Sequence, residues 1–190
     1  MKKHKIIAGM AVVTMLLTGC TNYAKQYDNN TLVVNRNGSL VEVSVEDFKD
    51  SSVKAEDLSA YIEEQVDNYN SDSGKDIKMV SIDTEDMSHV KLVLSYKNVE
   101  SYDAFNLLEY SLTDVNNVEE ASLTGSFTSA EDKKVNPADI IAEGKGKVLI
   151  LSEATDVVIK GTVLYYNDEV TYKDGVATTS GEKTAVIIFK

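Results

Sequence analysis

Residues 31–45 read Thr-Leu-Val-Val-Asn-Arg-Asn-Gly-Ser-Leu-Val-Glu-Val-Ser-Val. The dipeptide Asn37-Gly38 at the centre of this stretch tolerates positive φ at both central positions of a tight turn. The β-prone residues on either side therefore predict two strands, 31–35 and 39–45, joined as a hairpin. In the second strand, valines alternate with Glu42 and Ser44, which predicts one buried face and one solvent-facing face.

The apolar residues change their spacing after this hairpin. Between residues 54 and 70 they recur at offsets of three and four, which predicts an amphipathic helix lying on the sheet. We expect Gly74 to terminate it. The residues expected on its inward face are Leu58, Tyr61, Ile62, Val66 and Tyr69.

Alternation returns in the middle of the chain, where residues 77–83 and 89–97 predict two more strands. Asn98 or Ser101 can cap a following helix. Its expected apolar face carries Tyr102, Phe105 and Leu108. We also expect helical turns over 114–121, with Val115 and Val118 inward, and a short strand over 123–127.

A charged joint over 129–135 leads into the last part of the chain, where Asn136 and Pro137 predict the start of a short helix that stops by Gly144. After it the pattern is β alone. The expected strands are 148–151, 157–159, 163–166, 170–172 and 185–189.

These elements define an expected α+β fold. An N-terminal hairpin-helix-hairpin-helix layer is followed by a C-terminal all-β meander, which either forms a layer of its own or extends the first sheet. We expect residues 31–130 to form the α+β region and residues 131–190, the short helix plus meander, to pack against it.

The first nineteen residues have the parts of an export signal, with Lys2, Lys3 and Lys5 followed by the apolar run 6–17. That run is shorter than the roughly 20 residues that a membrane-spanning helix needs. Its ending, Leu17-Thr18-Gly19-Cys20, resembles the bacterial lipobox. The resemblance implies cleavage before Cys20 and diacylglycerol on the Cys20 sulfur. A plain secretory leader is the alternative, but it leaves the only cysteine of the chain without a role.

Residues 20–30 are polar and lack apolar periodicity, so we expect a lipidated N-terminus and a tether that spaces the domain from the bilayer. Two acyl chains on one residue suffice for stable anchoring, whereas one chain holds a protein only marginally.

The charge balance argues against two classes of partner. The leader holds three of the 19 basic residues and none of the 31 acidic ones, so the remaining chain carries a formal charge of −15. Nucleic-acid binders need a basic face, so we expect no nucleic-acid partner and no adhesion of the domain to anionic lipid headgroups.

We expect no catalytic, cofactor-binding or metal-binding residues. His89 is the only histidine after the leader, and a lone imidazole needs a nucleophile or metal beside it. The loop 70–76 resembles the start of a calcium loop, but Ser81 occupies the position of the bidentate glutamate. Three Ser-x-x-Lys matches lack the partner motifs of penicillin-recognising enzymes. They begin at Ser51, Ser88 and Ser180.

The order of features resembles the small, uncharacterised lipoproteins of Gram-positive, clostridial-type bacteria. The residues that carry the resemblance are the lipobox, Leu32-Val33-Val34 with Asn37-Gly38-Ser39, Val45-Glu46-Asp47-Phe48, Tyr102-Asp103-Ala104-Phe105-Asn106, and the closing segments 163–166 and 185–190. The resemblance implies an extracytoplasmic location and a mixed α/β domain, and it transfers no active site.

The sequence therefore leads to a hypothesis about location and a broader one about role. We expect a lipoprotein anchored through Cys20 to the outer face of the cytoplasmic membrane. Its non-catalytic domain would bind another envelope protein or a wall component, with Tyr165, Tyr166 and Tyr172 as candidate contacts. The alternative is a small solute-binding accessory protein of a transporter, with a pocket between the two regions. A hydrolase acting on wall polymer is a third possibility.

Overall fold

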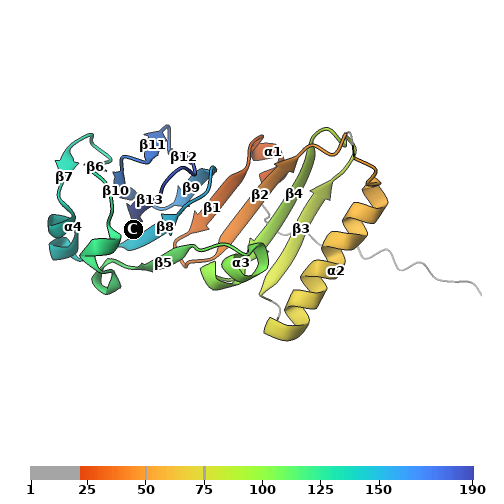
Figure 1. Ribbon diagram of the computed structural model, residues 1–190, viewed down its shortest axis with the longest axis horizontal. Coiled ribbons are helices and arrows are strands. Elements are labelled where there is room, and N and C mark those ends of the chain that lie inside the picture. The colour runs from red at the N-terminus through yellow and green to blue at the C-terminus, as the bar shows by residue number, and fades with distance from the viewer. Residues whose placement is uncertain (1–21, 50, 75) are drawn as a thin grey trace, which may run out of the picture.

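The computed structural model describes residues 22–49, 51–74 and 76–190. The leader, the lipobox and Cys20 lie outside the described residues. Two β-sheets lie side by side along the long axis of the molecule (Figure 1). The seven-stranded sheet has the order β11-β12-β9-β1-β2-β4-β3, and the six-stranded sheet has the order β5-β8-β13-β10-β6-β7.

The elements have the following bounds. The seven-stranded sheet contains β11 (Val170–Lys173), β12 (Val176–Thr179), β9 (Asp156–Lys160), β1 (Thr31–Asn35), β2 (Leu40–Glu46), β4 (Val90–Tyr96) and β3 (Ile77–Asp83). The six-stranded sheet contains β5 (Ser111–Asp114), β8 (Lys147–Leu151), β13 (Ala185–Phe189), β10 (Val163–Asn167), β6 (Phe127–Ser129) and β7 (Lys134–Val135). The helices are α1 (Tyr23–Gln26), α2 (Ala55–Ser73), α3 (Val99–Asn106) and α4 (Pro137–Glu143), with 3₁₀ turns η1 (Val115–Asn117) and η2 (Glu120–Ser122).

The hairpin at residues 31–45 is confirmed and stands near the middle of the larger sheet. Strands β1 and β2 pair antiparallel with Val33 opposite Val41, and Gly38 has the positive φ of 88° that the turn requires. On its other side, β1 pairs in parallel with β9, so that Leu32 lies opposite Val157. The C-terminal part of the chain thus continues the sheet that the N-terminal hairpin begins.

The α+β fold class with a run of antiparallel strands near the C-terminus is confirmed. The strands of that run divide between the two sheets: β9, β11 and β12 extend the first sheet, whereas β8, β10 and β13 form the middle of the second. The two arrangements that the sequence left open, a separate layer and an extension, therefore both occur.

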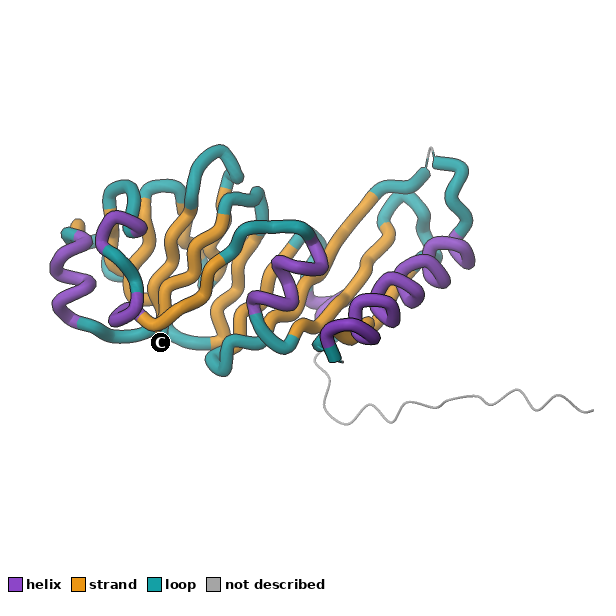
Figure 2. The backbone as a smooth tube through the Cα atoms, turned by 60° about the horizontal axis from the view of Figure 1, so that its bottom comes forward, coloured by secondary structure: helices purple, strands orange, loops and turns teal. Residues whose placement is uncertain are grey.

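Both faces of the hairpin are covered, and the expectation of one solvent-facing side is wrong. Val33, Val41 and Val43 pack on one face with Tyr23 and Tyr27 from the N-terminal segment. The opposite face, which carries Leu32, Val34 and Leu40, belongs to the main core. Figure 2 shows α2 and α3 along the sheets, and the main core includes Val66 of the first helix and Tyr102 of the second. Glu42 and Ser44 thus project into a covered region.

Helix α2 confirms the predicted amphipathic helix and runs three residues further, to Ser73, before Gly74 ends it at φ 88°. Val66 is buried, and Tyr69 packs edge-on against Phe105 with ring centroids 5.8 Å apart. The inward placement of Tyr61 is wrong, because this side chain is 56% exposed.

The remaining local predictions have mixed outcomes. Asn98 caps α3, since its side chain accepts from the Ser101 amide. The start of α4 at Pro137 and its end at Gly144 are confirmed, as are the helical turns with Val115 buried. The strand over 123–127 is wrong: Leu123 caps the turn η2, and β6 begins only at Phe127.

The segment 22–30 is folded onto the sheet, where the sequence predicted a polar spacer. The Lys91 ammonium, on a residue only 9% exposed, donates to the carbonyl oxygens of Ala24 and Tyr27 at 3.0 and 3.1 Å. It also donates to the Asp28 carboxylate at 2.6 Å, and this bond holds the pKa of Asp28 below its usual value. Three acceptors from one short segment therefore satisfy one buried cation, as a buried charge requires.

We expect Lys91→Met to release this segment while the sheets stay folded. Loss of charge-assisted hydrogen bonds should lower the local opening free energy by about 2 kcal/mol, so amide hydrogen exchange over residues 23–28 should accelerate roughly 30-fold. The control Lys97→Met removes an exposed ion pair with Asp76 and should leave those amides unchanged. Equal protection in wild type and Lys91→Met would show that the contacts do not hold the segment.

Candidate functional site

A pocket of about 230 Å³ opens where β1, β2, α3 and the loop between β8 and β9 meet. We call it the acidic pocket. Its lining includes Thr31, Glu42, Ser44, Glu46, Tyr102 and Glu153. Three of these residues are glutamates, and no lysine, arginine or histidine belongs to the lining. The pocket therefore joins the hairpin of the N-terminal region to a loop of the C-terminal region.

Glu42 forms one wall of the acidic pocket. The Tyr96 hydroxyl donates to its Oε2 at 2.5 Å, and the Ser44 hydroxyl donates to its Oε1 at 3.1 Å. The Asn106 amide contributes a longer bond of 3.5 Å. Burial nevertheless raises the pKa of the Glu42 carboxyl, and the nearby negative charge of Glu153 adds to the rise.

Glu153 lies in the loop between β8 and β9, and the fold fixes both its side chain and its backbone. The Tyr110 hydroxyl donates to its carboxylate at 2.7 Å, and the Thr179 hydroxyl donates to its backbone carbonyl. Like Glu42, it takes part in none of the ion pairs formed among residues 22–49, 51–74 and 76–190. Two partly buried carboxylates thus face one pocket without a protein cation.

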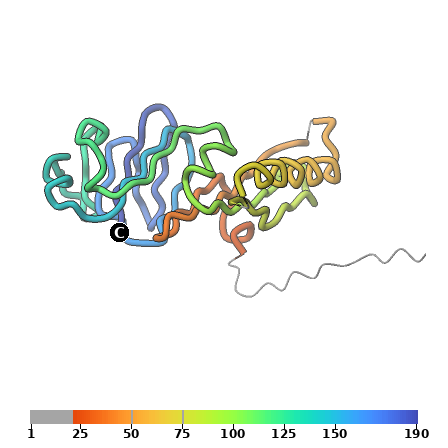
Figure 3. The backbone as a smooth tube through the Cα atoms, turned by 90° about the horizontal axis from the view of Figure 1, so that it is seen from below, coloured from red at the N-terminus to blue at the C-terminus, as the bar shows by residue number. Residues whose placement is uncertain are grey.

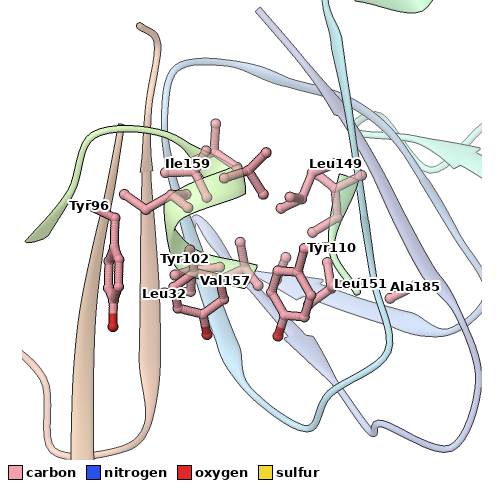
Figure 4. Packing of buried hydrophobic residues seen from close by; sticks show 14 of the residues in the cluster. Leu32, Tyr96, Tyr102, Tyr110, Leu149, Leu151, Val157, Ile159 and Ala185 are labelled. Carbon is pink, nitrogen blue, oxygen red and sulfur yellow. The ribbon is translucent and has the colours of Figure 1, made fainter. Parts of the chain in front are cut away.

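A row of three tyrosines, Tyr96, Tyr102 and Tyr110, connects the two carboxylates. Ring centroids lie 4.9 Å apart between Tyr96 and Tyr102, and 5.1 Å apart between Tyr102 and Tyr110. Figure 4 shows the three hydroxyl oxygens pointing to the same side of the core. Burial raises the pKa of each phenol, so all three stay protonated at neutral pH.

Tyr102 occupies the middle of this row and differs from its neighbours. Its side chain is 4% exposed and lines the pocket. The outer two hydroxyls donate to Glu42 and Glu153. The Tyr102 hydroxyl is placed to hydrogen-bond with that of Tyr110, and it is bonded directly to neither Glu42 nor Glu153. A hydroxyl has one donor and two acceptor lone pairs, so the Tyr102 oxygen can still accept a hydrogen bond from a ligand in the pocket.

The acidic pocket can therefore accept hydrogen bonds from a donor or hold a positive charge. Within residues 22–49, 51–74 and 76–190, no group of three or more His, Cys, Asp or Glu side chains is arranged to hold a metal ion. The same residues contain no helix with the length and apolar character needed to cross a membrane.

The residues that the sequence singled out lie elsewhere. Cys20 is outside the described residues, and His89 is exposed beside a turn, where its amide donates to the Asp86 carbonyl. In the Ser-x-x-Lys matches, Ser51 bonds to Phe48, Ser88 bonds to Asp86, and Lys183 pairs with Glu169. None of the three serines is hydrogen-bonded to its own lysine among the described contacts.

The calcium-like loop and the tyrosine surface also have structural explanations. The Asn70 side chain bonds both the amide and the carbonyl of Ile77, which ties the end of α2 to β3. Tyr165 donates to Glu143 at 2.6 Å, and Tyr166 packs against Tyr172 with centroids 5.5 Å apart. These three tyrosines are half-buried.

Sequence reasoning missed Glu42, Glu153 and the tyrosine row as a site. One signal was available: Tyr96 falls on the inward phase of its strand, and Tyr102 falls on the inward face of its helix. A phenol expected in a core needs a hydrogen-bond partner, and nearby glutamates can supply one.

Burial of Glu42 predicts a pH-dependent stability. Its folded pKa is raised above the ordinary value of 4.5, so its ionisation disfavours folding; the penalty is absent below that value and grows as pH rises through the folded pKa. Glu42→Gln should raise the free energy of unfolding by roughly 1 kcal/mol at pH 7 and by nearly nothing at pH 4. Urea denaturation at both pH values measures the difference.

The exposed Glu64 on α2 provides the control. Glu64→Gln makes the same change of charge and should show no pH-dependent gain. A Glu42→Gln protein that is less stable than wild type at pH 7 would mean that the hydrogen bonds outweigh the buried charge.

Comparison of the chain with protein-family models, curated proteins and solved structures found no match. The resemblance to small Gram-positive lipoproteins therefore stays a prediction.

Proposed function

We propose that this protein is a membrane-anchored, non-catalytic binding module of the cell envelope. Diacylglycerol on Cys20 would hold it at the outer face of the cytoplasmic membrane, and the acidic pocket would contact an envelope protein or a wall component. The observation that carries the binding role is the pair Glu42 and Glu153, which line one pocket without a protein cation. The lipobox supports the anchor.

The docked N-terminal segment supports a close approach to the membrane. Its helix α1 begins at Tyr23, three positions after the proposed lipid attachment site. Figure 3 shows α1 on the side of the sheet opposite α2. A lipid on Cys20 would therefore place the α1 side of the sheet near the bilayer, with little of the freedom that a flexible spacer gives.

Affinity capture from crosslinked native cells tests this proposal. Wild type should recover a defined envelope partner, and Cys20→Ser should lose both the partner and the incorporation of labelled palmitate. A wild-type protein that takes up no palmitate would refute the anchor. Palmitate incorporation without any reproducible partner would refute the interaction role.

One observation favours the alternative, a solute-binding accessory protein of a transporter. The acidic pocket lies between the two regions of the chain, because the hairpin supplies Glu42 and the C-terminal region supplies Glu153. A free solute that occupies the pocket should raise the melting temperature, and the rise should grow with the logarithm of the solute concentration above its Kd. Thermal-shift screening of the purified protein checks this.

A further inference from the structure

We propose that the acidic pocket binds a primary aliphatic ammonium group, carried either by a small free amine or by a lysine side chain of a partner protein. The inference rests on the proposed function, since it names the chemistry that the binding module recognises. Four features carry it: the cavity itself, its two carboxylates without a protein cation, its lack of basic lining residues, and the acceptor oxygen of Tyr102 in its lining.

The charges of the pocket select a cation. A buried carboxylate without a counter-charge is costly, and Glu42 and Glu153 both take up their protein hydrogen bonds from neutral phenols, a serine and an amide. A ligand that brings a positive charge would supply the missing partner. The surroundings reinforce this selection, because a third carboxylate, that of Glu46, lies at the same pocket.

The available acceptors favour ammonium. An alkylammonium carries three N–H donors and no acceptor. The pocket offers carboxylate oxygens from Glu42 and Glu153 together with the hydroxyl oxygen of Tyr102. A metal ion fits less well: calcium takes six to eight oxygen ligands, and the described residues contain no cluster of three metal-ligating side chains.

The phenol row positions the carboxylates ahead of binding. Tyr96 holds Glu42 at 2.5 Å and Tyr110 holds Glu153 at 2.7 Å, and their rings pack on either side of Tyr102. Acceptors fixed in this way lose little side-chain freedom when a ligand arrives, which favours binding of even a small cation.

Isothermal titration of the purified protein tests the proposal, with 1,4-diaminobutane as the free amine and N-acetyl-Gly-Lys-Gly-amide as the lysine source. At least one of them should bind with a Kd below about 1 mM at low salt, and the uncharged counterparts 1,4-butanediol and N-acetyl-Gly-norleucine-Gly-amide should not bind. Tighter binding of the diamine assigns the site to a free solute. Tighter binding of the peptide assigns it to a partner lysine. Failure of both amines, or equal binding of the neutral compounds, overturns the inference.

Variants locate the binding in the acidic pocket. Glu42→Gln and Glu153→Gln should each weaken the affinity roughly tenfold or more, because each removes a charged acceptor. Tyr102→Phe should weaken it about threefold, since one neutral acceptor is lost. Glu64→Gln makes the same charge change on the exposed face of α2 and should retain wild-type affinity. If Glu64→Gln weakened the affinity as much as the pocket variants do, the loss would reflect the net charge of the protein, and the assignment of binding to the acidic pocket would be wrong.

The inference and the proposed function fail separately. If a partner is captured in cells but neither amine binds, the module stands and this ligand chemistry is wrong. If an amine binds but no partner is captured and no palmitate is incorporated, the pocket stands and the envelope role is wrong. Binding of calcium at the same pocket, without binding of either amine, would also refute the proposed ammonium site.

Discussion

Truncation of Ile187 to alanine is expected to lower the free energy of unfolding by about 4 kcal/mol. Ile187 lies in β13, a strand whose five residues are all buried. It is 0% exposed and belongs to the main core together with Tyr110 and Leu149. Its alternating neighbour Ile188 faces the second cluster. Because both sides of β13 are packed, the surrounding chain can collapse only partly into the space that the missing methyl groups leave.

Urea denaturation at pH 7 measures this loss. Leu107→Ala is the control, since Leu107 is 90% exposed and an equivalent truncation there should change the free energy of unfolding by less than about 0.5 kcal/mol. A loss below about 2 kcal/mol for Ile187→Ala would contradict the close packing of β13 between two cores.

The second large effect is expected at Asn167, which is 1% exposed at the end of β10. Its side-chain nitrogen donates to the carbonyl oxygens of Thr124 and Thr184 at 3.0 and 2.9 Å. Its side-chain oxygen accepts from the Val186 amide at 3.0 Å. One amide thus joins the irregular segment before β6 to the start of β13.

Asn167→Ala should lower the free energy of unfolding by about 3 kcal/mol, because three backbone groups lose their partner in a buried place. Asn167→Asp retains the acceptor but directs a carboxylate at two carbonyl oxygens, so it should be at least as damaging. Asn68→Ala on the exposed side of α2 should be close to neutral. If denaturation gave Asn167→Ala the same free energy of unfolding as Asn68→Ala, water would have replaced the lost hydrogen bonds.

Local sequence patterns predicted the local structure well. The hairpin at Asn37-Gly38, the end of α2 at Gly74 and the start of α4 at Pro137 each depend on the conformational preference of one or two residues. Such preferences act within a few positions of the chain, so a single sequence reveals them. The strand expected over 123–127 failed for the same local reason, because alternation over so few residues also fits a 3₁₀ turn followed by Gly125 with φ 87°.

The covered face of β2 could not be predicted from alternation. A period of two distinguishes two faces, and it says nothing about what lies over the more polar one. Glu42 is drawn into the core because Tyr96, Tyr102 and the neighbouring C-terminal strands cover that face. The parallel pairing of β1 with β9 brings Glu153 to the same place. That pairing joins residues far apart in the chain, and no local pattern records it.

The docking of the N-terminal segment also could not be predicted from local sequence patterns. Residues 22–30 have too little apolar surface to predict a folded element. Their docking combines the packing of Tyr23 and Tyr27 against the sheet with the Lys91 ammonium, whose three acceptors lie in this segment. A lysine is rarely fully buried unless it is paired. The partners of Lys91 become visible only in the three-dimensional structure.

The most direct test of the ammonium site is a crystal structure of the protein grown with 1,4-diaminobutane. We predict density for the amine in the acidic pocket, with one nitrogen within hydrogen-bonding distance of the Glu42 or Glu153 carboxylate and of the Tyr102 hydroxyl. A pocket that holds only water at saturating diamine, with Glu42 and Glu153 still unpaired, would contradict the account.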